Sequence, residues 1–147
     1  MSNPPKHVYE VYIRTTPEKL WEAITSPEFT RRYFYGTAVI SDWRQGSRCV
    51  YRGDNDQVVI DGEVVEVEKP KRLVQTWKLV ENAEAPDDPP SRVIWQIEPQ
   101  GETCKLTLIH DGFDRETKTY QTVGPGWNPV LSGLKTLLET GQPLVIG

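Results

Sequence analysis

The spacing of apolar residues changes at Gly36, and this change limits the possible folds more than any other feature of the sequence. Beyond Gly36, apolar residues recur at every second position in successive segments, a pattern that predicts half-buried strands. We assign these strands to residues 37–42, 47–52, 58–68, 72–80, 91–98 and 103–111. Short connections rich in Gly, Pro, Asn and Asp predict that consecutive strands are antiparallel neighbours. The longest connection, residues 81–90, is acidic and proline-rich, and we expect a mobile hairpin tip without a site.

The segment before Gly36 predicts one strand followed by two short helices. Residues 8–14 alternate, and one face of this strand carries Tyr9, Val11 and Ile13. Residues 16–18 (Thr-Pro-Glu) supply a cap oxygen, a proline at the first helical position and a carboxylate near the positive end of the helix dipole. Residues 26–28 (Ser-Pro-Glu) repeat this signal for a second helix that ends near Phe34.

A long helix is predicted at the carboxyl end of the chain. It follows a polar segment, residues 112–126, and begins with Asn128 as cap and Pro129 at the first position. Gly141 ends it. Its apolar stripe needs a sheet to cover, and consists of Val130, Leu131, Leu134, Leu137 and Leu138. Strands that follow helices without a βαβ alternation favour the α+β class.

Length and charge restrict the partners. A chain of 147 residues can bury one substantial core, so we expect a single domain over residues 1–147. The net charge of -4, with no basic cluster, argues against nucleic acid. Neither a membrane-spanning apolar run nor a secretory leader is recognisable, so we expect a cytoplasmic protein. Cys49 and Cys104 lie in apolar strand-like runs and are expected to be buried free thiols.

Residues for metal or covalent chemistry are sparse. The two histidines are His7, which we place in a frayed terminus, and His110. No metal-binding spacing, phosphate-binding loop or nucleophile motif is present, so we assign no catalytic residue, metal or cofactor. A cavity enzyme using His110 with Asp111 or Glu63 remains a less favoured alternative, because strand parity turns Asp111 away from His110.

The order of elements resembles the START-related, birch-pollen-allergen-like (SRPBCC) superfamily, as do TTPEKLWEAITSPEFTRRYFYG near the start and GWNPVLSGLKTLLETG near the end. Within it, the chain is most similar to the heat-shock-protein-90 ATPase-activator homologue family. The middle segments SDWRQGSRCVYRG, VEVEKPKRLVQTW and LTLIHDGF also look like that family. The resemblance covers residues 8–139 and implies a helix-grip fold, in which a curved antiparallel sheet wraps around the long carboxy-terminal helix. It also implies an internal cavity and raises a chaperone partner as an alternative.

Strand parity predicts which side chains face that cavity. They are Cys104, Leu106, Leu108 and His110; Val93, Trp95 and Ile97; Leu73, Gln75, Trp77 and Leu79; and, with an uncertain register, Cys49 and Tyr51. The helix adds Trp127, Leu131, Leu134 and Leu138, while Tyr33, Phe34 and Phe113 are candidates for a mouth.

These walls predict a binding protein for a small apolar molecule: a carrier or sensor of a lipid, isoprenoid, polyketide or aromatic metabolite. The competing interpretation is that the same residues form a packed core. Gln75 and His110 need hydrogen-bond partners, supplied either by the protein or by a carbonyl or hydroxyl of the guest. The predicted ligand-binding residues are Tyr33, Phe34, Tyr51, Gln75, Trp77, Trp95, Leu108, His110, Phe113, Trp127, Leu131 and Leu134.

Overall fold

The computed structural model describes residues 4–80 and 87–145. Its elements are, in chain order, β1 (His7–Ile13), α1 (Pro17–Thr25), α2 (Pro27–Tyr33), β2 (Ala38–Ser41), β3 (Arg48–Arg52), β4 (Val58–Glu68), β5 (Arg72–Leu79), β6 (Ser91–Gln100), β7 (Thr103–Asp111) and α3 (Lys118–Thr140). Every predicted strand is present, with ends that differ by at most two residues. The predicted hairpin tip, residues 81–90, lies largely outside the described residues.

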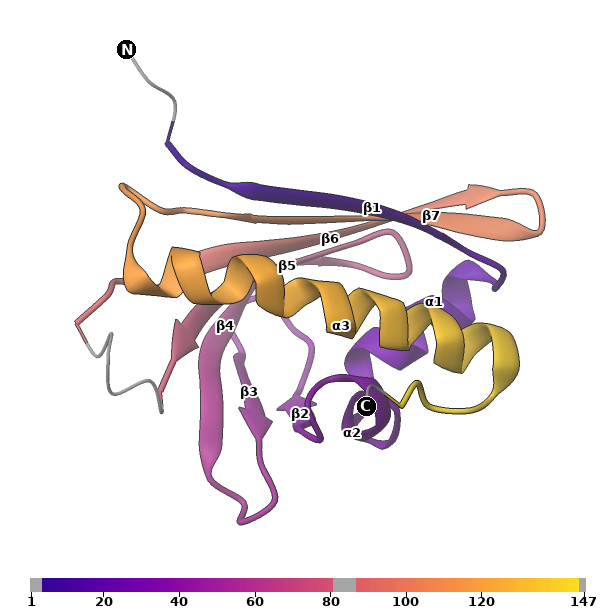
Figure 1. Cartoon of the computed structure of the whole chain (residues 1–147), viewed down its shortest axis with the longest axis horizontal. Helices are drawn as coiled ribbons and strands as arrows, with labels where there is room; N and C mark the ends of the chain where they lie inside the picture. The colour runs from indigo at the N-terminus through magenta and orange to yellow at the C-terminus, as the bar shows by residue number, and fades with distance from the viewer. Residues whose placement is uncertain (1–3, 81–86, 146–147) are drawn as a thin grey trace.

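The strands form one 7-stranded antiparallel sheet in the order β1-β7-β6-β5-β4-β3-β2. Strands β2 to β7 pair with their neighbours in sequence, as the short connections predicted. β1 instead pairs with β7, in a register that places His7 opposite His110 and Val11 opposite Leu106. The first and last strands therefore lie side by side, and α3 crosses the concave face that they complete (Figure 1). This arrangement confirms the α+β class and the helix-grip fold.

The curvature of the sheet comes from an irregularity in β4. The pairing of β4 with β5 shifts between Val64 and Glu66, which marks a bulge. Close by, a Cβ on Gly62 would lie 2.0 Å from the Thr76 carbonyl oxygen, so only glycine permits this approach. The Thr76 hydroxyl accepts a hydrogen bond from the Glu63 amide at 2.8 Å. As a result, β2, β3 and β4 run steeply away from the direction of β5, β6 and β7 (Figure 1).

The two short helices begin where they were predicted. The Thr16 hydroxyl accepts a hydrogen bond from the Lys19 amide at 3.2 Å, and Pro17 occupies the first turn of α1. Ser26 precedes α2, but its side chain makes no capping hydrogen bond; its carbonyl oxygen accepts from the Phe29 and Thr30 amides instead. Because the start signal at residues 26–28 acts through the backbone and Pro27, the second helix still begins there.

The prediction for the start of α3 was wrong. The helix begins at Lys118, not after Asn128, and contains both Pro125 and Pro129. One hydroxyl and one carboxylate accept hydrogen bonds from the first turn of the helix. Thr117 Oγ1 accepts from the Tyr120 amide at 3.1 Å, and the Asp88 carboxylate accepts from the Thr119 amide and hydroxyl at 2.9 Å each.

Side chains from outside α3 stabilise its proline-containing half. His7 Nε2 donates to the Tyr120 carbonyl at 2.9 Å, the Tyr9 hydroxyl donates to the Gly124 carbonyl, and the Tyr35 hydroxyl donates to the Gly126 carbonyl at 2.5 Å. These donors, together with the caps, support helical backbone where two amide donors are missing. None of them is recognisable from the local sequence.

The predicted inward faces are confirmed as the core. Residues with no exposed surface include Leu73, Gln75, Val93, Cys104, Leu106, Leu108, His110 and Leu134. Both cysteines are buried free thiols, as predicted. In the part of the chain that the structure describes, no helix is long and apolar enough to cross a membrane.

Candidate functional site: an apolar pocket under the first half of α3

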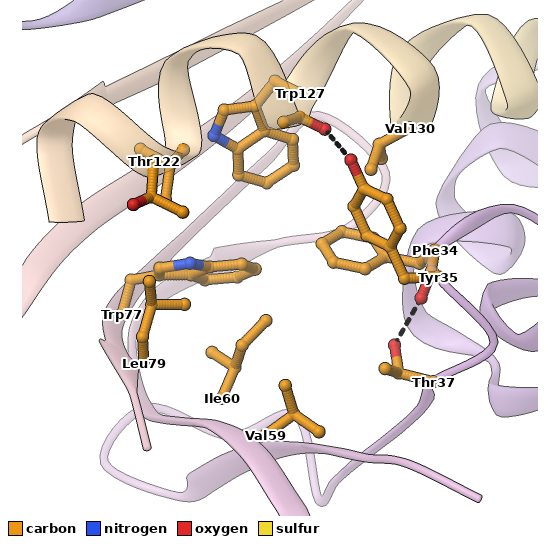
Figure 2. A pocket seen from close by; sticks show the side chains of 12 residues that line it. Phe34, Tyr35, Thr37, Val59, Ile60, Trp77, Leu79, Thr122, Trp127 and Val130 are labelled. Carbon is orange, nitrogen blue, oxygen red and sulfur yellow. Dashed lines mark hydrogen bonds between the residues drawn. The ribbon is translucent and has the colours of Figure 1, made fainter. Parts of the chain in front are cut away.

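A pocket of about 320 Å³ lies between β4, β5, the first half of α3 and the loop after α2. Figure 2 shows its walls: the Trp127 ring on one side, the Trp77 ring across from it, and the rings of Phe34 and Tyr35 at one end. The lining residues are Phe34, Tyr35, Thr37, Val59, Ile60, Trp77, Leu79, Thr122, Val123, Gly126, Trp127 and Val130. Tyr35 and Thr122 are exposed, so the pocket opens to the surface.

The pocket wall is uncharged. No lining residue is Asp, Glu, Lys, Arg or His, and two of its hydroxyls are already used. The Tyr35 hydroxyl bonds the Gly126 carbonyl, and the Thr37 hydroxyl donates to the Phe34 carbonyl at 2.7 Å (Figure 2). Because burying an unpaired charge in such surroundings is costly, the pocket suits a neutral, largely apolar molecule.

Three aromatic rings of the pocket wall pack against one another. The centroids of Trp77 and Trp127 lie 5.4 Å apart, with Phe34 at 5.9 Å from Trp77 and 5.6 Å from Trp127. Trp77 reaches this position because it stands on the inward face of β5, as strand parity predicts. Tilted and edge-on contacts of this kind are favourable and restrict ring rotation.

A hydrogen bond from Trp127 to His110, which does not line the pocket, fixes the position of the Trp127 ring. Trp127 Nε1 donates to His110 Nδ1 at 3.0 Å, and His110 Nε2 lies 2.7 Å from Ser91 Oγ. An acceptor at Nδ1 requires the neutral tautomer with its proton on Nε2, so this imidazole donates to Ser91. Burial, reinforced by His7, lowers the pKa of His110 to about 3. The ring is therefore neutral, with both nitrogens occupied.

That tautomer excludes His110 as a base toward Ser91, because its Nε2 atom carries a proton and offers no lone pair. The proposed acidic partners lie elsewhere: Asp111 forms two 2.7 Å hydrogen bonds with Arg92, and Glu63 is exposed. His110 also does not line the pocket. The structure thus does not bring together the residues of the alternative in which His110 acts in a cavity enzyme.

Gln75 also finds its partners within the protein. Its Oε1 accepts from Trp95 Nε1 at 2.7 Å, and its Nε2 donates to Cys49 Sγ at 3.1 Å. Burial raises the pKa of the Cys49 thiol to about 12, so this cysteine is not a reactive thiolate. The Tyr51 hydroxyl nearby is buried and makes no hydrogen bond with any described residue. Burial, with smaller effects of Cys49 and Tyr33, raises the pKa of Tyr51 well above its usual value, and the neighbouring Gln75 side chain opposes this rise.

The structure separates the predicted ligand-binding residues into two groups. Phe34, Trp77 and Trp127 line the pocket. The others lie in the core or elsewhere around it: Tyr33, Tyr51, Gln75, Trp95, Leu108, His110, Phe113, Leu131 and Leu134. Phe113 does not line the pocket, and its ring packs on His110 and Tyr120 with centroid distances of 5.0 and 5.2 Å. The Tyr33 hydroxyl donates to the Ala23 carbonyl at 2.7 Å.

Several pocket residues were not among those predicted. From the first half of α3 these are Thr122, Val123 and Gly126, and from elsewhere Tyr35, Thr37, Val59, Ile60 and the α3 residue Val130. Leu79 also lines the pocket; it was predicted to face the cavity but was not among the predicted ligand-binding residues. Thr122, Val123 and Gly126 were missed because the helix was expected to start at Asn128. Those of β4 and the loop after α2 depend on the bend in the sheet, which only Gly62 signals in the sequence.

His7 corrects another expectation. It belongs to β1 and not to a frayed terminus, and its ring stacks on Tyr120 with a centroid distance of 4.1 Å. Its position against α3 follows from pairing with β7, a long-range contact. Over residues 4–80 and 87–145, no group of three or more His, Cys, Asp or Glu is arranged to hold a metal ion.

Comparison with known proteins adds evidence on ancestry. The family described as "Activator of Hsp90 ATPase homolog 1-like protein" matches residues 14–139. No curated protein matches the chain.

Solved structures share the fold over most of the chain. A crystal structure of a protein from Mesorhizobium loti is 29% identical, with a TM-score of 0.77, 91% of this chain covered and 96% of the other. CalU16 from Micromonospora echinospora is 24% identical, with a TM-score of 0.75 and coverages of 95% and 76%. A crystal structure described as an HSP90 activator from Plasmodium falciparum is 22% identical, with a TM-score of 0.73 and coverages of 90% and 95%.

Proposed function

This chain belongs to the family of proteins like the activator of Hsp90 ATPase homologue 1, and within that family we propose that it binds a small, neutral, apolar molecule as a carrier or sensor. The observation that supports this most is the uncharged pocket of about 320 Å³, whose walls are mainly aromatic and aliphatic. Monomeric proteins normally pack their interiors closely, so an apolar hollow of this size calls for an explanation.

The size of the pocket limits the guest. Its volume is at the lower end of the range for small-molecule sites, which corresponds to roughly ten to eighteen non-hydrogen atoms. A fused ring system or a short prenyl chain fits this limit, whereas a complete two-chain lipid does not.

A fluorescence titration tests the proposal. The probe N-phenyl-1-naphthylamine brightens in apolar surroundings, and we expect saturable binding with one site per chain. Val59→Trp should abolish binding by filling the pocket, because Val59 is only partly buried and lines it. Val65→Trp is the matched control, since Val65 lies on the same strand, is 39% exposed and is not part of the pocket. Linear, unsaturable fluorescence, or equal binding by both variants, would refute the proposal.

Stimulation of a chaperone ATPase is a second candidate, favoured by the family match. Such an activity would use the outer surface and not the pocket. It predicts that the purified chain raises the ATPase rate of Hsp90 from the same organism, and that Val59→Trp leaves this effect unchanged. An unaltered ATPase rate across a wide range of concentrations would eliminate this candidate.

We further propose that residues 1–147 act as one domain in the cytoplasm. Support for one domain comes from the pairing of β1 with β7, which joins segments from both ends of the chain. Two buried free thiols are compatible with a reducing compartment. Unfolding followed by tryptophan fluorescence and by circular dichroism should give coincident transitions, and cell fractionation tests the location.

A further inference from the structure

The indole N–H of Trp77 is the one polar group of the pocket's aromatic wall without a partner among the described residues. The residue is 2% exposed and lines the pocket, so the little surface it retains faces that space. In residues 4–80 and 87–145, nothing accepts a hydrogen bond from its indole N–H. The Tyr51 hydroxyl is the one fully enclosed side-chain polar atom without a partner in this part of the chain, so the Trp77 N–H is not sealed within the core.

The neighbouring tryptophans differ from Trp77 in this respect. Trp95 donates to Gln75 and Trp127 donates to His110, so each of these indoles is satisfied by a buried side chain. Buried indole N–H groups usually have such a partner, because an unsatisfied donor loses its hydrogen bond to water without compensation. A donor left open to an otherwise apolar pocket is therefore suited to an acceptor supplied from outside the protein.

We propose that the ligand is an uncharged ring compound with a hydrogen-bond acceptor, such as a ketone, quinone or ether oxygen, and that Trp77 Nε1–H donates to this acceptor. This inference rests on the proposed binding function and defines the chemistry of its ligand. The acceptor is neutral because the wall supplies no cation, and its open donors, the Trp77 N–H and the Thr122 hydroxyl, are too few to compensate a buried carboxylate. Trp77 thereby determines specificity, while the surrounding rings supply most of the contact area.

The test compares two probes that differ by a single carbonyl group: 1-tetralone and tetralin. Binding of each is measured by displacement of N-phenyl-1-naphthylamine. The preference ratio is the dissociation constant of tetralin divided by that of 1-tetralone, so a larger ratio means a stronger preference for the ketone. In Trp77→Phe, the ring remains but the donor is lost, so this ratio should fall roughly fivefold relative to the native protein. Using a ratio of ratios cancels the cost of removing the ketone from water.

Trp127→Phe is the matched control, because it makes the same change in the same pocket. Its lost N–H bonds His110 and not the ligand, so both probes should bind less well but the preference ratio should stay within about twofold of the native value. A loss of preference in Trp127→Phe equal to that in Trp77→Phe would overturn the assignment of the donor to Trp77.

A spectroscopic measurement on the native protein makes the test independent of variant stability. In a ¹⁵N–¹H spectrum, the indole signal of Trp77, assigned through its own ring protons, should move downfield with tetralone and not with tetralin. An equal response to both probes overturns the inference while leaving the pocket as a binding site. If neither tetralone, tetralin nor the fluorescent probe binds, the proposed function fails together with it.

Discussion

The two halves of α3 cover very different interiors. The second half, from Leu131 onward, packs closely: Leu134 has no exposed surface, and the backbone approaches α2 so closely that a Cβ on Gly133 would lie 3.2 Å from the Tyr33 Cβ. The first half contains Pro125 and Pro129 and lies over the pocket. One helix thus packs into the core at one end and covers the pocket at the other.

The difference shows how each half is stabilised. Leucines and other apolar side chains secure the second half by burial, which favours dense packing. The first half depends on hydrogen bonds from His7, Tyr9 and Tyr35 to its carbonyl oxygens. Directional polar contacts can position a helix at a distance from the sheet, which leaves room beneath it, whereas apolar packing draws the two surfaces together.

The largest expected effect distinguishes the two interiors by truncation. Leu134→Ala should lower the free energy of unfolding by about 3–5 kcal/mol, because it leaves a cavity in a closely packed region. Ile60→Ala should cost less, about 1–2 kcal/mol, because Ile60 already borders empty space and has fewer contacts to lose. Urea denaturation of both variants measures these values. Equal losses would show that the pocket wall is packed as tightly as the core.

Acid should lower the free energy of unfolding through His110, which bonds Trp127 of the pocket wall. Its pKa is lowered to about 3 in the folded protein, so between pH 6.5 and 3 the unfolded chain binds a proton that the folded one does not. Stability must therefore fall as the pH drops below 6.5, by at most about 1.4 kcal/mol per pH unit. Measurements from pH 6.5 to 5 avoid most carboxyl titration. An imidazole signal of His110 titrating near pH 6 would contradict this account.

A smaller effect concerns two buried tyrosines. Tyr51→Phe removes a hydroxyl that has no partner, so the free energy of unfolding should stay constant or rise by about 1 kcal/mol. Tyr33→Phe removes a hydroxyl that donates to the Ala23 carbonyl, and should cost about 1 kcal/mol. Thermal denaturation of the pair checks this contrast, and a clear loss for Tyr51→Phe would reveal a partner such as an ordered water molecule.

The smallest effect compares glycines in the two halves of α3. A Cβ on Gly126 would meet only the Tyr35 hydroxyl at 3.7 Å, so Gly126→Ala should stabilise the helix by about 0.5–1 kcal/mol. At Gly133 the same change meets Tyr33 at 3.2 Å, so the gain should disappear or become a loss. Melting temperatures of the two variants should therefore differ in sign, and stabilisation by both would argue against tight packing of the second half.

Most of the fold could be predicted because it is encoded locally. Alternation located each strand, Thr16 and Pro17 located α1, and parity identified the buried positions of β5 to β7. The start of α3 could not be found this way. Two prolines and two glycines in its first half argue against a helix, and the contacts that overcome this preference come from Asp88, His7 and other residues distant in sequence.

The site was less predictable than the fold. Parity shows that a side chain faces inward, but it does not distinguish a residue on a cavity wall from one packed in the core. Trp77 and Trp95 have the same parity on adjacent strands, yet only Trp77 borders the pocket. The difference depends on where the sheet bends and where α3 is held away from it, and both are properties of the assembled fold.

The hydrogen bonds from β1 and the α2–β2 loop to α3 also affect how a guest would enter. Each such bond can be exchanged for one to water at a cost of only about 0.5–1.5 kcal/mol, whereas lifting Leu134 would expose a buried leucine. We therefore expect amide protons of residues 121–128 to exchange with deuterium well before those of 131–138, through brief excursions that do not require global unfolding. The first half of α3 would then open and close the pocket by moving relative to the second half, which stays packed from Leu131 onward.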